Sequence, residues 1–523
     1  MPRLSVSRRR FLLATPAAIA LAACSPLERK PTVSVVDHGA VGDGTADDSA
    51  AITAAVAALK PGSVLHFPAG RYRFAEHNPK HGAAISIAGL SHIDIDFAAD
   101  AELVMDNVNA RNNTGTSHGI LIQGPASDIA LRNVHIRWVQ QTKRSMGDGV
   151  RIVGYPDGVD RVPDGWNGPA APVRGVTLSD CLIQAAPQAG VVMMGVSDIT
   201  VTNLRSEDTQ ADGLHFNACR RAKVDGHTAV NTGDDGLALV TYFSDKSSFD
   251  SAAQTFAFPG LTGWSNADFS IKNVAVSGGH ANGVRLAGAL RVDIDGLTVD
   301  DVQHGAAVMI DSATAGHEVD WEYVSARDVT LARVDAQDCE FGIQVLARPA
   351  ETVDRRFLDF AVDVADARLR RCTNWSVRVE SLSGQQVTGV SLGDVTIDAT
   401  SAAGGNGGVG LANAHDVHFR HLKIEHSQAV TTFSAINTSQ LAVDDLEVTV
   451  TLPKASDDAA PCARFENTEG VIDTMAVRWP SAPEQWKPVL LTPLAACDAA
   501  GPPLVIDTIT VEPSFLADRI KTC

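Results

Sequence analysis

A short phrase recurs along the middle of the chain: a polar residue, a glycine, then an apolar, a variable and a second apolar residue. Three of its glycines, Gly190, Gly213 and Gly236, are evenly spaced, since 213 − 190 and 236 − 213 both equal 23. The phrase is spelled Asp148-Gly149-Val150-Arg151-Ile152, Asp212-Gly213-Leu214-His215-Phe216, Asp235-Gly236-Leu237-Ala238-Leu239 and Asn282-Gly283-Val284-Arg285-Leu286.

Between these copies lies a second phrase rich in Val, Ile, Asn and Asp, such as Ile199-Thr200-Val201-Thr202-Asn203-Leu204. Short alternating strands that recur at such a period are typical of a parallel β-solenoid, whose coils bury their apolar faces only by stacking. We therefore predict an all-β fold, a single-stranded right-handed parallel β-helix over residues 33–450. Residues 451–523 are expected to form the terminal coils and the C-terminal cap of the same domain.

The start of the mature chain predicts a helix that caps this solenoid. Ile52 and Val56 have helical spacing in an Ala-rich run, and Asp47 or Asp48 can accept hydrogen bonds from its free N–H groups. A helix here would cover the apolar end of the first coil.

The step from Gly236 to Gly283 is about two periods long and is rich in aromatic residues. We interpret it as a long loop that projects over one face, because long loops on a rigid scaffold often carry function. Tyr242 and Trp264 in this loop are candidates for stacking on sugar rings.

The first 24 residues have the pattern of an export signal. Basic Ser7-Arg8-Arg9-Arg10 precedes an Ala-rich apolar stretch, ending at Ala23, that is too short to span a bilayer. It resembles a twin-arginine signal, and Leu21-Ala22-Ala23-Cys24 resembles a lipoprotein cleavage box. We expect residues 1–23 to be a signal and 24–32 a linker. The mature protein would be periplasmic or otherwise extracytoplasmic, touching a membrane only through a lipid on Cys24.

The charge of the chain narrows the class of partner. A formal net charge of -19 and a pI near 5.2 exclude nucleic acid, whose phosphates require a surplus of Lys and Arg. An anionic glycan would need local basic residues for the same reason. Cys462, Cys497 and Cys523 are candidate disulfide partners in an oxidising compartment. The cysteine and histidine spacing predicts no metal site.

Three aspartates begin two successive coils. If the glycines stack in register, Asp212 and Asp235 share one column about 4.8 Å apart, with Asp234 beside them. Such crowding raises one carboxyl pKa enough to retain a proton near neutrality. A protonated acid beside an ionised base is what glycoside hydrolysis requires, so these three are the candidate catalytic residues.

Strand alternation places the middle residue of each phrase on the outer face. His215 and Arg285 would then line a groove beside the carboxylates, with Arg151 further along it. A guanidinium there can bind the carboxylate of a uronic acid through two hydrogen bonds.

Two resemblances support this interpretation. The opening from Asp37-His38-Gly39 through Phe67-Pro68-Ala69-Gly70-Arg71-Tyr72 resembles pectate-lyase-superfamily β-helix domains. Further on, the chain resembles polygalacturonase-like glycoside hydrolases at Gln210-Ala211-Asp212-Gly213, Gly233-Asp234-Asp235, Gly279-His280-Ala281 and Arg285-Leu286-Ala287. The second resemblance implies that Asp234 is the general acid and that Asp212 and Asp235 activate water in an inverting reaction.

The same resemblance implies that His280 and the in-register Asn282 bind substrate, and that no cofactor is needed. The lysine of the family's Arg-Ile-Lys motif is replaced by Ala287. The chemistry leaves alternatives open. A polysaccharide lyase on this scaffold would hold Ca²⁺ on the aspartates and use Arg285 or Lys246 as base. Epimerisation of a carbohydrate, or a binding solenoid without catalysis, are the others.

Overall fold

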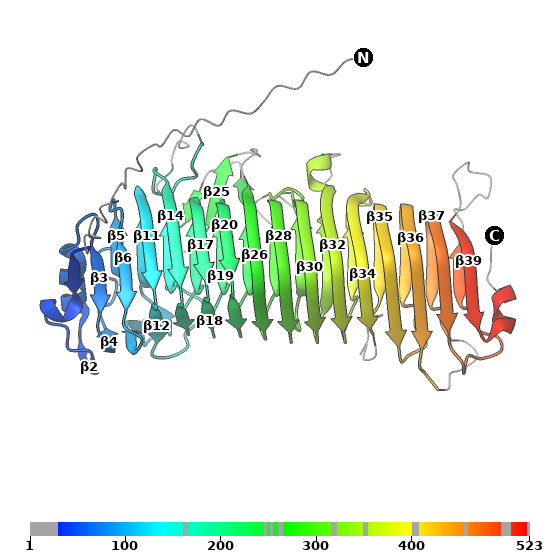
Figure 1. The fold of residues 1–523 in the computed structure, drawn as a ribbon, viewed down its shortest axis with the longest axis horizontal. Helices are drawn as coiled ribbons and strands as arrows, with labels where there is room; N and C mark the ends of the chain where they lie inside the picture. The colour runs from blue at the N-terminus through cyan, green and yellow to red at the C-terminus, as the bar shows by residue number, and fades with distance from the viewer. Residues whose placement is uncertain are drawn as a thin grey trace, which may run out of the picture.

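The computed structural model is a long rod of stacked coils that runs from the N-terminal to the C-terminal end of the chain (Figure 1). It describes residues 30–159, 166, 168–244, 248–250, 255–259, 265–314, 322–348, 354–399, 407–453, 459–492 and 504–519. Within these residues 34 strands form one continuous sheet, and strands of neighbouring coils pair in parallel. The predicted parallel β-helix is confirmed.

Each coil contributes to three stacks of strands. The stack that carries the glycine phrase is called the site stack: β5 (Ala83–Ala88), β10 (His118–Gln123), β13 (Val150–Val153), β16 (Val191–Met194), β19 (Leu214–Asn217), β22 (Leu237–Val240), β27 (Val284–Ala287), β29 (Ala306–Ser312), β31 (Phe341–Ala347) and β33 (Val377–Ser381).

The second stack begins with β3 (Val64–Phe67), β6 (Asp94–Phe97), β11 (Ala126–Arg132), β14 (Val173–Ser179), β17 (Val196–Thr202) and β20 (Arg220–Asp225). The third stack begins with β4 (Gly70–Phe74), β7 (Ala101–Met105), β12 (His135–Trp138), β15 (Leu182–Gln184), β18 (Arg205–Glu207) and β21 (Thr228–Val230). Later strands are long enough to run through both: β26 (Asn266–Ser277), β28 (Ala289–Asp300), β30 (Arg327–Gln337), β32 (Asp359–Arg370) and β34 (Val387–Asp398).

In the last coils three still longer strands are followed by two shorter ones, and two short helices occur in the described part of this half of the chain. These elements are β35 (Val409–His426), β36 (Phe433–Val450), β37 (Ala463–Arg478), β38 (Val489–Thr492), β39 (Val505–Glu512), η2 (Arg355–Phe357) and η3 (Ser514–Arg519). A small antiparallel pair, β8 (Val108–Asn109) and β9 (Thr114–Gly115), projects from an early coil.

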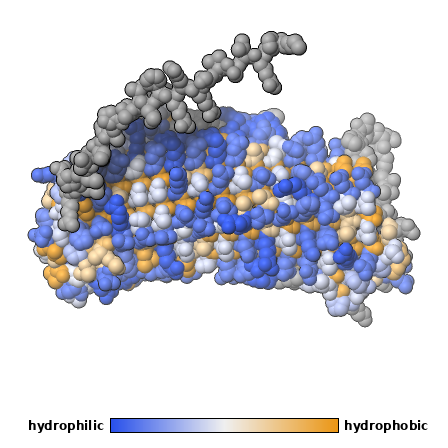
Figure 2. Space-filling view, viewed as in Figure 1, coloured by the Kyte–Doolittle hydropathy of each residue, from blue (hydrophilic) through white to orange (hydrophobic). Residues whose placement is uncertain are grey.

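The core is a column of apolar side chains inside the coils. Val191, Leu214, Leu237 and Val284 pair in register and are fully buried. Outer positions are mostly polar, and Figure 2 shows hydrophilic residues over most of the visible face, with apolar bands along the long axis. The alternation predicted from the phrase is therefore present.

Glycine is required in the phrase because neighbouring coils approach closely. A Cβ on Gly213 would lie 2.6 Å from the carbonyl oxygen of Gly236, closer than real Cβ contacts allow. Gly190 and Gly236 face the same restriction, at 2.5 Å and 2.7 Å. The even glycine spacing thus reports a tight backbone column rather than a special dihedral angle.

The N-terminal cap consists of β1 (Thr32–Ser34), η1 (Val35–His38), β2 (Asp43–Asp47) and α1 (Ser49–Ala57). Ile52 of α1 is fully buried, as expected of a helix that covers the core. Asp47 accepts a hydrogen bond from the Ser49 N–H at 3.1 Å, whereas the Asp48 carboxylate binds the N–H groups of Val41 and Gly42 instead. Asp48 stands at the N-cap position without a side-chain bond to the helix, and Asp47, one residue earlier, accepts from the first N–H of the helix.

The aromatic segment between Gly236 and Gly283 was predicted to be a long loop, but part of it is a small sheet. Its described parts form a three-stranded sheet of β23 (Tyr242–Ser244), β25 (Thr255–Pro259) and β24 (Ser248–Asp250). Cys462 is a free thiol buried in the core, and its Sγ donates to the carbonyl of Pro488; Cys497 and Cys523 lie outside the described residues. No helix in the described part of the chain is long and apolar enough to cross a membrane.

Candidate active site

Asp212, Asp234 and Asp235 meet on the outer side of the site stack. One carboxylate oxygen from each lies within 4.8 Å of the others, and no other such trio of potential ligand atoms occurs in the part of the chain that the structure describes. Asp212 and Asp235 are buried, while the Asp234 side chain is 31% exposed. The predicted convergence of the three carboxylates is present, and Asp234 is the one that reaches solvent.

A ladder of side chains fixes this column to the backbone of the next coil. Asp212 Oδ1 accepts from the Asp235 N–H at 3.1 Å, and Asp235 Oδ1 accepts from the Asn282 N–H at 3.1 Å and from its Nδ2 at 2.8 Å. Asn282 Oδ1 in turn accepts from the Ala306 N–H at 2.9 Å. Asn282 therefore holds Asp235, and its predicted contact with substrate stays a prediction.

The sequence around Asp234 brings it out of this column. A Cβ on Gly233 would lie 2.4 Å from the Gln210 carbonyl oxygen, so only glycine lets this turn pack on the coil below. Thr232 Oγ1 donates to the Asp234 carbonyl at 2.9 Å and closes the turn. The Gly-Asp-Asp sequence therefore places one carboxylate in the column and the other at its edge.

Burial changes the acidity of this pair. It raises the pKa of Asp235 to about 7, and the charges of Asp212 and Asp234 add to the effect while Arg285 opposes it. Burial and the Asp212 charge also raise the pKa of Asp234, against the guanidinium of Arg144. Burial thus raises the pKa of both neighbouring carboxyls, and a raised pKa is what a general acid requires.

His215 lies on Asp212. Its Nδ1 is 2.7 Å from Asp212 Oδ2, and because a carboxylate only accepts, Nδ1 is the donor. Burial lowers the pKa of His215, but the charges of Asp212, Asp235 and Asp234 outweigh it and raise the pKa above its ordinary value. Its Nε2 is buried without a hydrogen-bond partner. His215 therefore lies beside the carboxylates as predicted, and its contact with substrate stays a prediction.

Arg144 is the site residue that the sequence patterns missed. It arrives from the connection between β12 and β13, and its Nη1 lies 2.8 Å from Asp234 Oδ2. Its side chain is 52% exposed. No periodic signal marks it, because it precedes the repeated phrase on an earlier coil and reaches Asp234 only through the folded loop.

Arg285 is held in a buried network that was also unforeseen. Its Nε and Nη2 bind the two carboxylate oxygens of Asp311 at 3.2 and 3.0 Å, and Nη2 also contacts the Tyr323 hydroxyl at 3.0 Å. Arg348 Nε contacts Asp311 at 3.2 Å. Asp311 is fully buried, and although burial alone would raise its pKa, the two guanidiniums lower it. The Arg285 side chain keeps 22% of its surface exposed toward the outside.

Two apolar clusters border the carboxylates along the axis. On the preceding coils, Tyr155 and Trp166 meet edge to face at 5.5 Å over Val192 and Ala211. On the following coils, Tyr323 packs with Ala238 and Ala287, and Tyr242 meets it edge to face at 6.2 Å. Tyr242 is half-buried against this cluster, and burial raises its pKa. It thus forms part of the wall.

The other predicted binding residues lie elsewhere or outside the description. Arg151 is 1% exposed, with its Nη1 3.5 Å from Asp148 Oδ2, because the loop cluster of Tyr155 covers this coil; it does not line an open groove. His280 is exposed on the coil after Asp234, and its ring packs 5.3 Å from that of His304. Trp264, Lys246 and Cys24 lie outside the described residues.

Each of the three carboxylates accepts from a nitrogen donor: Asp212 from His215, Asp234 from Arg144 and Asp235 from Asn282. These donors bind Asp234 at Oδ2 and Asp235 at Oδ1. The lyase alternative would place calcium on oxygen ligands of this cluster, and Arg285, its candidate base, is bound to Asp311.

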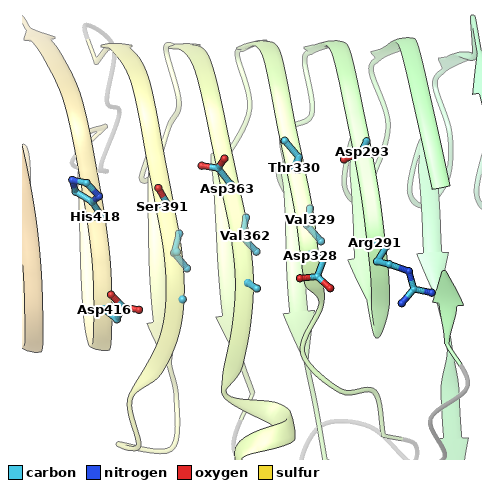
Figure 3. Close-up of a pocket in the computed structure, with 13 residues that line it drawn as sticks. Arg291, Asp293, Asp328, Val329, Thr330, Val362, Asp363, Ser391, Asp416 and His418 are labelled. Atoms are coloured by element: carbon cyan, nitrogen blue, oxygen red, sulfur yellow. The ribbon is translucent and has the colours of Figure 1, made fainter. Parts of the chain in front are cut away.

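A cavity of about 730 Å³ lies on the second stack, away from these residues, along β28, β30, β32, β34 and β35. Asp328, Asp363 and Asp416 are among the residues that line it (Figure 3). A neighbouring hollow of about 520 Å³ shares Arg291 and Asp293 with it. We call the two together the polar trough. Its carboxylates stand on successive strands and form no cluster like that of Asp212.

The strand pairing and the outward carboxylate cluster define the class of the protein as a parallel β-helix. Residues 32–151 match the family model described as rhamnogalacturonase A/epimerase, pectate lyase-like. This match agrees with the resemblance seen in the opening of the sequence. A comparison with curated protein sequences gave no match.

Several solved structures share the fold at low sequence identity. The catalytic unit of a GH87 α-1,3-glucanase from Streptomyces thermodiastaticus is 16% identical, with 94% of this chain and 70% of that chain covered and a TM-score of 0.47. A family 28 exopolygalacturonase from Yersinia enterocolitica is 14% identical over 95% and 79%, with a TM-score of 0.40. The A-module of a mannuronan C-5 epimerase from Azotobacter vinelandii is 12% identical over 91% and 98%, with a TM-score of 0.41.

Proposed function

We propose that the protein is a polysaccharide-degrading glycoside hydrolase that acts on a pectin-like or other uronate-containing glycan. The observation that carries this proposal is the cluster of Asp212, Asp234 and Asp235, in which two carboxyls have raised pKa values on an outer face bordered by aromatic walls. An acid that holds a proton near neutrality beside an ionised carboxylate supplies both proton transfers of glycoside cleavage.

Asp234 is the proposed general acid. Asp234 and Asp235 both have raised pKa values, but Asp234 has the exposed side chain and can deliver a proton to a leaving oxygen. Asp235 and Asp212 are the proposed activators of water. His215 Nδ1 donates to Asp212 Oδ2 and orients that carboxylate.

We further propose that the reaction inverts the anomeric centre. Both oxygens of Asp212 accept from N–H groups, which makes it a poor nucleophile for a covalent intermediate. The oxygen spacing, within 4.8 Å, is nevertheless shorter than the roughly 6.5–9.5 Å usual for inverting enzymes. The anomer formed first, measured by proton NMR during hydrolysis, tests this part of the proposal: a retained configuration contradicts it.

The remaining parts of the proposal concern location and cofactors. The export signal over residues 1–23 and the lipid on Cys24 are inferred from the sequence pattern alone. We propose an extracytoplasmic enzyme that requires no cofactor, because general acid and base groups suffice for glycoside hydrolysis.

The test is to incubate the mature protein with polygalacturonate, rhamnogalacturonan and neutral glycans, and to follow reducing ends and ultraviolet absorbance with and without a calcium chelator. We expect reducing ends without absorbance, unaffected by the chelator and lost in Asp234→Asn. Absorbance that the chelator abolishes would instead identify a calcium-dependent lyase. If neither reducing ends nor absorbance appear with any glycan, the hydrolase assignment for these substrates is contradicted and a binding solenoid is favoured.

A further inference from the structure

The ion pair between Arg144 and Asp234 conflicts with the acid role of Asp234. A guanidinium 2.8 Å from a carboxylate favours the ionised form, whereas a general acid must carry a proton when it acts. Asp234 therefore has to part from Arg144 before the reaction. A substrate that offers Arg144 another carboxylate would cause this separation directly.

Arg144 is displayed by a firmly anchored segment. On one side, the Lys143 N–H donates to the Asn113 carbonyl at 2.9 Å; on the other, the Ser145 N–H donates to the Pro187 carbonyl at 2.9 Å. Ser145 Oγ also accepts from the Gly115 N–H at 2.9 Å. These bonds tie the segment to coils on both sides of it. The guanidinium thus stands over the carboxylates on a rigid support, with about half of its side chain exposed.

The charges around Asp234 are consistent with an exchange of partners. Arg144 faces it from the β12–β13 connection, Asp212 and His215 from the coil before, Asp235 from its own coil, and Arg285 from the coil after. Arg285 and His215 already bind Asp311 and Asp212 through two hydrogen bonds and one, respectively. Among the residues that the structure describes, Arg144 has a single side-chain hydrogen bond, to a partly exposed partner, so its ion pair is the one that an incoming anion breaks at least cost.

We propose that Arg144 binds the carboxylate of a uronic acid unit next to the scissile bond, and that Asp234 occupies this cation only until the substrate arrives. On binding, the substrate carboxylate replaces Asp234 on the guanidinium, and Asp234 takes a proton from solvent. No covalent bond other than that O–H forms or breaks. Arg144 is thus a specificity-determining and positioning residue, and the inference rests on the proposed function of Asp234.

The inference predicts a competition that binding measurements can isolate. All variants are made in the mature chain that carries Asp235→Asn, which suppresses turnover. Calorimetry then measures their affinity for oligosaccharides of galacturonate, mannuronate and glucuronate, and for the same oligosaccharides with reduced carboxyl groups. Adding Asp234→Asn should tighten uronate binding about tenfold, because the competing carboxylate is gone. Adding Arg144→Gln should weaken it about tenfold and remove the gain from Asp234→Asn. Reduced oligosaccharides should respond to neither change.

Two variants separate recognition from folding. Arg144→Lys keeps the charge but loses the planar fork, so it should restore part of the affinity. Lys143→Gln removes a neighbouring exposed cation and should leave binding unchanged. Equal loss for uronate and reduced oligosaccharides, no effect of Arg144→Gln, or no binding of any uronate would each overturn the inference.

Kinetics on a uronate glycan that the enzyme hydrolyses test the role of Arg144 further. A purely structural role of Arg144 would not change KM and the pH profile in the way described next. Arg144→Gln should raise KM about tenfold with little loss of kcat. The alkaline limb of the kcat/KM profile should shift to higher pH, because removing the cation raises the pKa of Asp234 in the free enzyme. If hydrolysis does not depend on Arg144, the inference about Arg144 is refuted while the proposed hydrolase function stands.

If uronate binding depends on Arg144 but no glycan is hydrolysed, the proposed hydrolase function is refuted while the uronate-binding site stands.

Discussion

The carboxylate cluster and the polar trough both carry aspartates and arginines on outer faces of one β-helix. The pKa values of their aspartates, however, are shifted in opposite directions. Beside the trough, Arg221 binds Asp198 through two hydrogen bonds and Arg291 binds Asp268 in the same way. Those arginines lower the pKa of both carboxyls. In the cluster, burial raises the pKa of Asp234 and Asp235 despite the arginines nearby.

The difference comes from what covers each face. The paired side chains of the trough are between 39% and 49% exposed, so water solvates them and each acid has its own cation. Loops and aromatic side chains border the cluster, where three acids lie together and one of the nearby guanidiniums, that of Arg285, is bound to Asp311. Aspartates occur on both faces, so their presence is not sufficient for raised pKa values. What distinguishes the cluster is that loops and aromatic side chains shield its aspartates from water.

The largest difference is expected in catalysis. Asp235→Asn should reduce hydrolysis of a responsive glycan by about 10³-fold, because it removes a carboxylate proposed to activate water. Asp268→Asn, at the trough, should leave the rate unchanged within about twofold. Initial rates of reducing-end release measure both. Comparable losses in the two variants would mean that the trough takes part in the reaction.

A smaller difference is expected in stability. Asp311 is fully buried against Arg285, Arg348 and Tyr323, so Asp311→Asn should lower the free energy of unfolding by about 2–3 kcal/mol. Asp268→Asn breaks an exposed pair and should cost no more than about 0.5 kcal/mol. Urea unfolding of both variants beside the unsubstituted protein provides the comparison. Equal losses would show that burial does not separate the two kinds of ion pair.

The smallest difference is expected in the dependence of stability on pH. The folded pKa of Asp235 is raised to about 7, so its contribution to stability is full below its unfolded pKa and is lost as the pH rises through about 7. Asp235→Asn should therefore be about 1–2 kcal/mol more stable than the unsubstituted protein near pH 8, with less gain near pH 5. Asp268 has a lowered pKa, and its contribution is lost only as the pH falls through that value.

The control for this measurement is Asp268→Asn, which should gain nothing near pH 8. Unfolding by urea at the two pH values gives the free energies. If Asp235→Asn gains the same free energy of unfolding at pH 5 and at pH 8, the negative charge of Asp235 does not destabilise the folded protein.

The sequence predicted the fold and the meeting of the three aspartates because both follow from a repeat. Once Gly213 and Gly236 stack, Asp212 and Asp235 must share a column, and alternation must turn His215 outward. The same regularity could not reveal Arg144 or the loop that covers Arg151, since their positions depend on the path of irregular connections. Nor could it show that Arg285 is bound by Asp311 from the following coil of the site stack.

The ladder from Asp212 through Asp235 and Asn282 to the Ala306 N–H has a consequence for how such a site changes over time. Because each side chain is bonded to the main chain of its neighbour, the spacing of the acids is a fixed property of the backbone repeat. Loops can lengthen, shorten or exchange their side chains without disturbing it. A β-helix of this kind can therefore acquire new sugars by remodelling its loops while its proton-transfer groups remain at the same separation.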